Sequence, residues 1–295
     1  MCAAYAVFTT GFGGSALLAV ACLMTGIARG GNNNFCGTMM STLPRKKSAI
    51  GYNLLHGAFA MGAVISPLAL ILCTAGIVML CIVQLVCYGK MRLPAENVTR
   101  SIKTVDRSFL KSRNFWLGAT ILFFYISTEY AIVNWLVTYF KDTGILSERV
   151  SQLMSSILWI VIFIGRMIGA ALVGRVPRKR ILLVDGVGTL CFFLLVFFSR
   201  SELPIFIGIM GIGLFMATIY TCAMSQGIDG IRGNDLAVST ITLIGAAGGI
   251  VTPAVVGLVA ERAGIQTGMG VVVAVTVILL AAIILSVRYS TDTDI

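Results

Sequence analysis

The sequence predicts an all-α polytopic membrane protein, and three observations lead to that class. Of its 295 residues, 58% are hydrophobic and 12% are charged, with a mean hydropathy of +0.95, whereas a soluble domain carries about a quarter charged residues. Apolar stretches of about 20 residues recur along the chain, and each is long enough to cross the roughly 30 Å hydrocarbon core of a bilayer. These stretches are continuous rather than alternating, which favours helices over the strands of a closed barrel.

Nine membrane-spanning helices are expected after an apolar stub at residues 1–14. The segment 49–89 has no polar break, but basic residues flank both of its ends, so it must turn back within the membrane near Thr74. It is therefore counted as two spans. The expected spans are residues 15–40, 49–71, 74–89, 114–140, 150–174, 180–199, 203–226, 235–260 and 266–287.

The basic residues divide unequally between the two sides of the expected membrane. One side receives sixteen Lys and Arg, and the other receives only Lys141, Arg149, Arg200 and Arg262. Cytoplasmic loops carry an excess of Lys and Arg. We therefore expect a multi-pass protein of the cell (plasma) membrane whose C-terminus is cytoplasmic. The net charge of +10 is explained by these loops, and nucleic acid is not expected as a partner.

The residues that commonly carry covalent or metal chemistry are scarce. The eight cysteines form no CxxC pair, there is a single histidine, and no phosphate-binding loop is present. Cysteines inside apolar segments are typical small core residues. No arrangement of a nucleophile with a base, or of paired carboxylates, is visible. We expect no enzyme activity, no metal and no cofactor.

An internal repeat suggests how the helices are organised. GAVISP at residues 62–67 resembles GGIVTP at residues 248–253, an offset of 186 residues, which makes the repeat unit six helices. The same offset leaves residues 114–186 without an N-terminal counterpart, so equivalents of two helices and part of a third are expected to be missing. The expected domains are a partial N-terminal bundle (1–91), a cytoplasmic linker (92–113) and a complete six-helix C-terminal bundle (114–295).

GRMIGAALVGRVPRKR, residues 165–180, resembles the loop between helices 8 and 9 of the major facilitator superfamily, whose motif is approximately G-x-x-x-D/G-R/K-x-G-R-K/R. Ala170 and Pro177 stand where the motif usually has glycine. The resemblance implies a gating role for this loop, and Arg166 is expected to tie it to its neighbours in one conformational state. The expected gating residues are Gly169, Gly174, Arg175, Arg178, Lys179 and Arg166.

Two further segments resemble the fucose-permease-like branch of the same superfamily. NLLHGAFAMGAVISP, residues 53–67, is similar to its helix 5, and FWLGATILFFYISTEYAIVNWLVTYF, residues 115–140, is similar to its helix 7. The resemblance implies a partial fold with the equivalents of helices 4–12, in a branch where sugars are commonly carried with protons. Residues 26–34, GIARGGNNN, contain no acid, whereas symporters of this branch often carry one on helix 4, so proton coupling is not carried over from the family.

Glu129 is the main candidate for a solute or ion site. It is the only charged residue between Phe115 and Phe140 and is expected near the bilayer midplane, the depth at which such transporters bind their solutes. A carboxylate there must face the protein interior. The alternative is a structural pair with Arg166, but the two residues are expected to differ in depth by roughly 10 Å, which is long for direct contact.

The other expected solute-binding residues are polar or aromatic side chains within the spans. Arg29, Asn32 and Asn33 share a helix face and form either a hydrogen-bonding wall or a cluster at the cytoplasmic end, from which Arg29 reaches water. For the remaining residues, the alternatives to solute binding are hydrogen bonds between helices and core packing. These residues are Asn53, His56, Asn134, Trp135, Tyr220 and Gln226.

The sequence thus favours a secondary active transporter of a small polar solute, with a sugar as the first candidate. We expect a monomer in the lipid bilayer that works by alternating access, is incomplete as given, and has a proton or sodium ion as candidate co-substrate. Two alternatives stay open. One is a truncated or regulatory membrane protein that does not transport, and the other is a drug or metabolite exporter on the same fold.

Overall fold

The computed structural model describes residues 15–41, 45–68, 107–172, 174–229 and 234–290, together with the single positions 79, 83 and 231. Every regular element within these residues is a helix. The chain divides into two compact units, Met1–Gly37 with Ile65–Asp106, and Thr38–Val64 with Arg107–Ile295. Helix α2, Ser15–Ser41, lies mainly in the first unit. Most of α3, Arg45–Leu68, belongs to the second.

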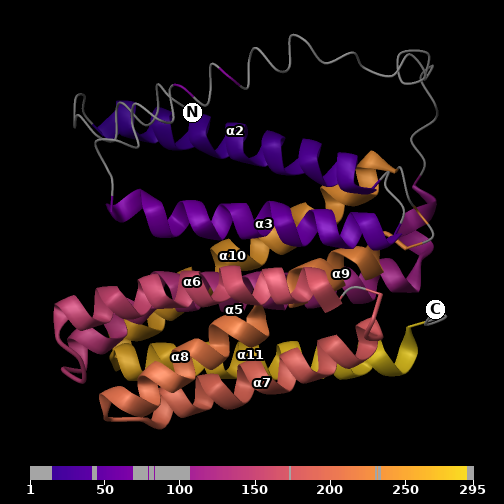
Figure 1. The fold of residues 1–295 in the computed structure, drawn as a ribbon. Coiled ribbons are helices and arrows are strands. Elements are labelled where there is room, and N and C mark those ends of the chain that lie inside the picture. Colours follow the sequence, from indigo (N-terminus) through magenta and orange to yellow (C-terminus); the bar gives the residue numbers. More distant parts are fainter. Residues whose placement is uncertain are drawn as a thin grey trace. The chain divides into compact units, whose positions relative to one another are not determined.

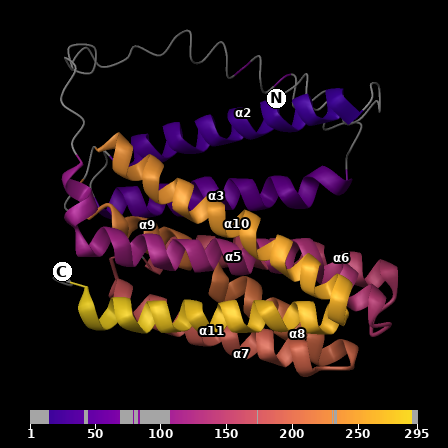
Figure 2. The same cartoon turned by 180° about the vertical axis from the view of Figure 1, so that it is seen from behind.

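The second unit is a helical bundle arranged around α5 (Figure 1). Helix α5 packs against α6, α9, α10 and α11. Helix α10 crosses α5 obliquely (Figure 2), and α7 and α11 lie side by side in both views. Besides the 3-10 helix η2 at Ser108–Lys111, the elements after α3 are α5 (Arg113–Asp142), α6 (Glu148–Leu172), α7 (Arg178–Phe198), α8 (Glu202–Met216), α9 (Ile219–Gly227), α10 (Asp235–Ala263) and α11 (Ile265–Tyr289).

The six spans predicted after residue 113 are confirmed. In the described part of the chain, six helices are long and apolar enough to cross a membrane, with α8 and α9 counted together as Glu202–Gly227. The predicted spans 15–40 and 49–71 correspond to the helices α2 and α3, which are not among the six. The predicted span 74–89 lies outside the described residues, apart from two single positions.

Local sequence signals explain where several helices begin and end. The Ser112 hydroxyl caps α5 by accepting a hydrogen bond from the Phe115 amide at 3.3 Å. Asn234 caps α10 in the same way, with its side-chain oxygen 3.2 Å from the Ala237 amide. Such caps satisfy amides that have no partner within the helix. Gly264 adopts φ +82° between α10 and α11, a conformation that glycine tolerates at little cost.

The span predicted at 203–226 is one crossing but not one continuous helix. Helix α8 ends at Met216 and α9 begins at Ile219, which leaves Ala217 and Thr218 in a short interruption. The apolar pattern of this segment gave no sign of the interruption, because hydropathy alone does not distinguish a continuous helix from a broken one.

Small residues and lipid-facing side chains complete the bundle. A Cβ atom added at Gly118 would lie 2.7 Å from the Ala223 carbonyl oxygen and from the Gly227 nitrogen, so the backbones of α5 and α9 are in direct contact.

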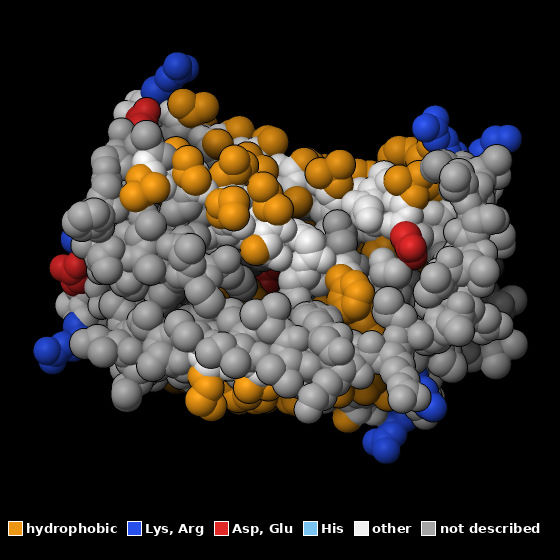
Figure 3. Space-filling view, turned by 90° about the horizontal axis from the view of Figure 1, so that it is seen from above, with side chains coloured by type: hydrophobic (Ala, Val, Ile, Leu, Met, Phe, Trp, Pro, Cys, Tyr) orange, Lys and Arg blue, Asp and Glu red, His pale blue; other side chains and the backbone are white. Residues whose placement is uncertain are grey.

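Large apolar side chains such as Leu243 (71% exposed) and Ile250 (72%) point outward. On the face drawn in Figure 3, many of the described hydrophobic side chains lie together at the surface. An apolar surface of this kind suits a lipid environment.

Candidate functional site

Glu129 and Arg166 form a buried ion pair within the second unit. Glu129 lies near the middle of the 30-residue helix α5 and is 8% exposed, while Arg166 on α6 is 2% exposed. The Arg166 Nη2 atom lies 3.4 Å from Glu129 Oε1. Each charge therefore offsets the cost of burying the other.

This contact corrects the expectation that the two residues are too far apart in depth to meet. The expectation treated the two helices as parallel rods and took only the rise along their axes. An arginine side chain is long and extends several ångströms from its helix, so it can cross the difference in depth. The same guanidinium donates a hydrogen bond from Nη1 to the backbone carbonyl of His56 on α3. Within the described residues, Arg166 thus contacts α3 and α5. It had been expected to contact the basic loop that precedes α7.

Three aromatic residues surround the ion pair. The Tyr125 hydroxyl donates a hydrogen bond to Glu129 Oε1 at 3.0 Å. The ring of Tyr220 on α9 lies 4.1 Å from that of His56 and 6.2 Å from that of Tyr125, measured between centroids. We call Glu129, Arg166, Tyr125, His56 and Tyr220 the central cluster. Four of these residues were singled out from the sequence, and Tyr125 was missed because an aromatic residue in an apolar helix is ordinarily part of the core.

Asn53 also belongs to the polar interior, one helical turn before His56. Its side-chain oxygen lies 3.3 Å from the Thr221 hydroxyl of α9, and its amide nitrogen donates to the Ala49 carbonyl at 3.0 Å. Gly169 of α6 makes room here, since a Cβ atom at that position would lie 2.1 Å from the Thr218 methyl carbon and 3.4 Å from Asn53 Oδ1. Helices α3, α6 and α9 therefore approach one another at Asn53, Gly169 and Thr221, which are small or polar residues.

A second buried carboxylate, Asp185 on α7, was not identified from the sequence. It is 9% exposed, and the Thr218 hydroxyl donates a hydrogen bond to its Oδ2 atom. Asp185 lies only seven residues after Arg178 and close to a basic loop, so its position in the sequence resembled that of a residue at a helix end. Asp185 is buried because α7 packs against α8, α9 and α11, and the sequence alone does not show this packing.

The start of α7 is held to the residues that follow α9 by a salt bridge. Arg178 Nη1 lies 3.0 Å from Asp229 Oδ2 and 3.3 Å from the Ser225 hydroxyl. Gly174 adopts φ +77° in the loop before α7. Arg175 is exposed and Lys179 is half-buried. Arg178 and Arg166 are therefore the expected gating residues for which the structure shows a specific ionic contact.

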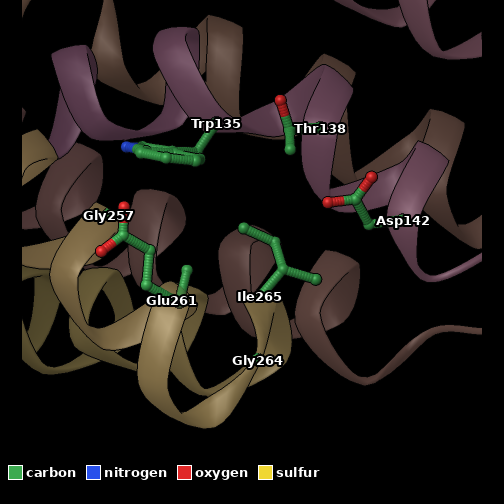
Figure 4. A pocket seen from close by; sticks show the side chains of 8 residues that line it. Trp135, Thr138, Asp142, Gly257, Glu261, Gly264 and Ile265 are labelled. Atoms are coloured by element: carbon green, nitrogen blue, oxygen red, sulfur yellow. The ribbon is translucent and has the colours of Figure 1, made fainter.

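A cavity of about 520 Å³ lies at the ends of α5, α10 and α11. The Trp135 indole nitrogen donates to the Pro253 carbonyl at 3.0 Å, and its ring rests above Gly257, whose added Cβ would lie 3.0 Å from the ring. Figure 4 shows Trp135, Thr138 and Asp142 of α5 facing Gly257 and Glu261 of α10 across this space. Trp135 is thus a cavity residue, at a different place from the central cluster.

The remaining expected solute-binding residues are not brought into the central cluster. Asn134 is exposed on α5. Gln226 is buried and exchanges hydrogen bonds with Ser286 of α11, at 2.6 Å from its nitrogen and 2.9 Å from its oxygen. Arg29, Asn32 and Asn33 are on α2, in the first unit. Their roles stay predictions.

These features define the class of protein: a polytopic helical membrane protein with an ionic cluster buried among its helices. The Major Facilitator Superfamily model matches residues 1–233, which is most of the chain. The protein belongs to the Major Facilitator Superfamily, as the resemblance of residues 165–180 predicted.

Curated relatives are distant. Major facilitator superfamily domain-containing protein 4A of Danio rerio is 27% identical over 150 residues, covering 50% of this chain and 28% of the relative. A putative glucose/galactose transporter of Helicobacter pylori is 22% identical over 171 residues, covering 58% of this chain and 42% of the relative. A glucose/galactose transporter of Brucella abortus is 23% identical over 156 residues, covering 52% of this chain and 38% of the relative. The matched segments span less than half the length of each of these relatives.

Among solved structures, the fold is similar to that of the E. coli fucose:proton symporter FucP. One FucP structure aligns with a TM-score of 0.75 and 17% identity, covering 99% of this chain and 81% of that one. A second, in an outward conformation, aligns with a TM-score of 0.73 and 19% identity, covering 99% and 78%. At this level of identity the likeness shows the fold.

Proposed function

We propose that the protein is a secondary active transporter of a small polar solute, with sugars as the solute class, and that the central cluster binds the solute or a co-transported ion. The observation that carries the proposal is the buried Glu129–Arg166 pair on α5 and α6. Ionisable residues inside a membrane are costly and commonly mark solute or ion pathways. Glu129 also lies near the middle of α5, and transporters of this architecture bind solutes near the bilayer midplane.

The chemistry of the cluster suits a hydroxyl-rich ligand. Glu129 offers carboxylate oxygens as acceptors, while Arg166 and the tyrosine hydroxyls offer donors. Arg166 Nε is buried and has no hydrogen-bond partner within the described residues, and an unpaired buried donor costs about 1–3 kcal/mol. A solute oxygen bound at this N–H would remove that cost. The aromatic faces of His56 and Tyr220 add an apolar surface beside these polar groups.

The relatives support sugars as the class to test first. Two curated relatives are named as glucose/galactose transporters, and the similar solved fold is that of a fucose:proton symporter. A proton is accordingly the first co-substrate to test, with sodium as the alternative. The cavity beside Trp135 is a second place where a sugar ring could stack, because its indole is held by Pro253 and lines the open space.

Alternating access requires contacts that form in one state and break in another. The Arg178–Asp229 salt bridge fits such a contact, because it joins the start of α7 to the residues that follow α9. Arg166 fits a second, because it holds both α3 and α5. We further propose that the loop bearing Arg178 and the C-terminus are cytoplasmic in the plasma membrane, in accordance with the distribution of Lys and Arg.

The proposal is tested by equilibrium binding of radiolabelled glucose, galactose and fucose to the purified chain in lipid nanodiscs. Glu129→Gln is expected to weaken binding of the recognised sugar at least about tenfold, equivalent to about 1.4 kcal/mol. The matched control is Glu148→Gln, which neutralises an exposed carboxylate paired with Lys141 and should leave binding unchanged. Equal affinity in the chain and in Glu129→Gln, or no saturable binding of any of the three sugars, would contradict the proposal.

A further inference from the structure

Asp185 is a buried carboxylate that the proposed solute site does not use. It lies on α7, seven residues after Arg178, which places it roughly 10 Å along the helix from the basic loop. It is 9% exposed, and Thr189, one turn further along α7, is completely buried. A charged side chain within a membrane-spanning helix is costly, and such residues commonly serve ion pathways or proton relays.

The surroundings of Asp185 offer a hydrogen bond but no counter-charge in contact with it. The Thr218 hydroxyl donates to Asp185 Oδ2. None of the ion pairs within the described residues includes Asp185. Arg178, at the start of the same helix, is already paired with Asp229. The carboxylate is therefore stabilised by a neutral donor, which is a weaker partner for a negative charge than a cation would be.

The helices packed against α7 are α8, α9 and α11, and their titratable groups do not neutralise Asp185. On α9, Cys222 lies near both Asp185 and Arg178, but a thiol carries no positive charge. At this level α11 is apolar, since Leu280 and Ile283 pack over Gly186. The other titratable groups on these helices are Glu202 at the first turn of α8, Tyr220 in the central cluster, and Arg288 and Tyr289 in the last turn of α11.

Thr218 has a special place in the fold because it lies in the interruption between α8 and α9. Membrane proteins often place ion sites at such broken helices. The Thr218 carbonyl lies 2.9 Å from the Thr221 hydroxyl, which in turn lies 3.3 Å from Asn53 Oδ1. A chain of hydrogen-bonding groups thus leads from α7 through α9 to α3, the helix that also carries His56.

From this arrangement we propose that Asp185 and Thr218 form a proton-binding site separate from the central cluster. The ligand is a proton delivered by hydronium in water at the end of α7 near Arg178. One O–H bond forms at an Asp185 carboxylate oxygen as one O–H bond of hydronium breaks, and a neutral water molecule remains. The buried negative charge disappears, and the hydrogen bond from Thr218 weakens because its acceptor is no longer ionised.

This site can act on the proposed solute site through α9. When Asp185 is ionised, Thr218 anchors the interruption between α8 and α9 to α7. When Asp185 is protonated, that anchor is weaker, and α9, which carries Tyr220 of the central cluster, is less restrained. A proton bound at Asp185 therefore makes it easier for α9 to move relative to α3, to which it is joined by the contact between Thr221 and Asn53.

Infrared difference spectroscopy of the chain in nanodiscs between neutral and acidic pH tests the site without any solute. We expect a carbonyl-stretch band from a newly protonated carboxyl group, which shifts in D2O and is lost in Asp185→Asn. The matched control, Glu129→Gln, should retain that band. Thr218→Val keeps the side-chain shape but removes the hydroxyl, and should move the band to higher frequency because the carboxyl group loses its hydrogen-bond partner.

Two results would overturn the proposal. The first is a difference spectrum that is the same in the unsubstituted chain and in folded Asp185→Asn. The second applies if Asp185→Asn does not fold: an acid-induced carboxyl band that is unmoved in folded Thr218→Val would show that the titrating group is not the partner of Thr218. Because no sugar is present, failure here is distinct from failure of the solute-binding test at Glu129.

Discussion

Arg166 joins Glu129 to the backbone of α3. Its Nη2 atom lies 3.4 Å from Glu129 Oε1, and its Nη1 atom donates to the His56 carbonyl. One guanidinium thus links α3, α5 and α6, and the first two of these helices carry His56, Tyr125 and Glu129 of the central cluster. Any ligand that competes for Glu129 or Arg166 changes this link, so binding at the cluster and the contacts between helices are coupled.

The first prediction concerns the stability of this ion pair. Arg166→Met and Glu129→Leu should each lower the free energy of unfolding by about 3–5 kcal/mol, because each leaves a buried charge without its partner. The double variant should be less destabilised than the sum of the two single variants. Unfolding in mixed detergent micelles measures all four proteins. Strict additivity would show that the two side chains do not interact in the folded protein.

The second prediction concerns the contact between α5 and α9. Gly118→Ala should destabilise the protein by about 1–3 kcal/mol, because the added methyl group meets backbone atoms of Ala223 and Gly227 at 2.7 Å and backbone cannot easily move away. Gly270→Ala is the matched control, since nothing lies within 4 Å of its added Cβ. This control should be neutral or stabilising by up to about 1 kcal/mol. Similar unfolding midpoints for the two variants would contradict the close packing of α5 on α9.

The third prediction concerns the salt bridge between Arg178 and Asp229. Arg178→Gln removes the cation that holds the end of α9, so the backbone amides of residues 228 and 229 should exchange hydrogen for deuterium faster. Arg175→Gln removes an exposed cation of the same loop and should leave that exchange unchanged. Mass spectrometry of deuterated peptides from residues 219–229 provides the measurement. Equal exchange in both variants would remove Arg178 from the proposed gating contact.

The fourth prediction concerns orientation in the membrane. A membrane-impermeant maleimide should label Ser147→Cys from outside intact cells, and should label Arg175→Cys only after the cells are permeabilised. The positive-inside distribution predicts this order, and both positions are exposed in the structure. The unsubstituted chain, whose cysteines mostly lie in apolar segments, is the control. The opposite labelling order would reverse the proposed topology.

Hydropathy and the placement of charged residues were sufficient to predict the helices from Arg113 to Tyr289 to within three residues at each end. The interruption at Ala217 and Thr218 was not predictable, because both flanking segments are continuously apolar. Glu129, Arg166, His56 and Tyr220 were each recognised as unusual within their helices. It was not predicted that these residues lie together. The separation of Glu129 and Arg166 was estimated along the helix axes, and that estimate ignores the length of an arginine side chain.

The second carboxylate illustrates a different limit of the sequence. Asp185 follows the basic loop by two helical turns, and a residue so placed can lie either at the membrane surface or in the packed interior. Only the packing of α7 against α8, α9 and α11 decides between these, and it places Asp185 against Thr218. Tyr125 was likewise not identified from the sequence, because only the structure shows that its hydroxyl donates a hydrogen bond to Glu129, one turn further along α5.

The most direct test of the central claim is sugar uptake into cells or vesicles containing the protein, measured across a range of pH for the unsubstituted chain, Glu129→Gln and Glu129→Leu. Glu129→Gln is expected to fold, because the amide keeps the shape of the side chain and an oxygen that can accept from Arg166, and it is expected to lose uptake or its dependence on pH because the charge is gone. If Glu129→Gln transports as well as the unsubstituted chain at every pH, while Glu129→Leu only reduces the amount of folded protein, the carboxylate serves packing and hydrogen bonding alone.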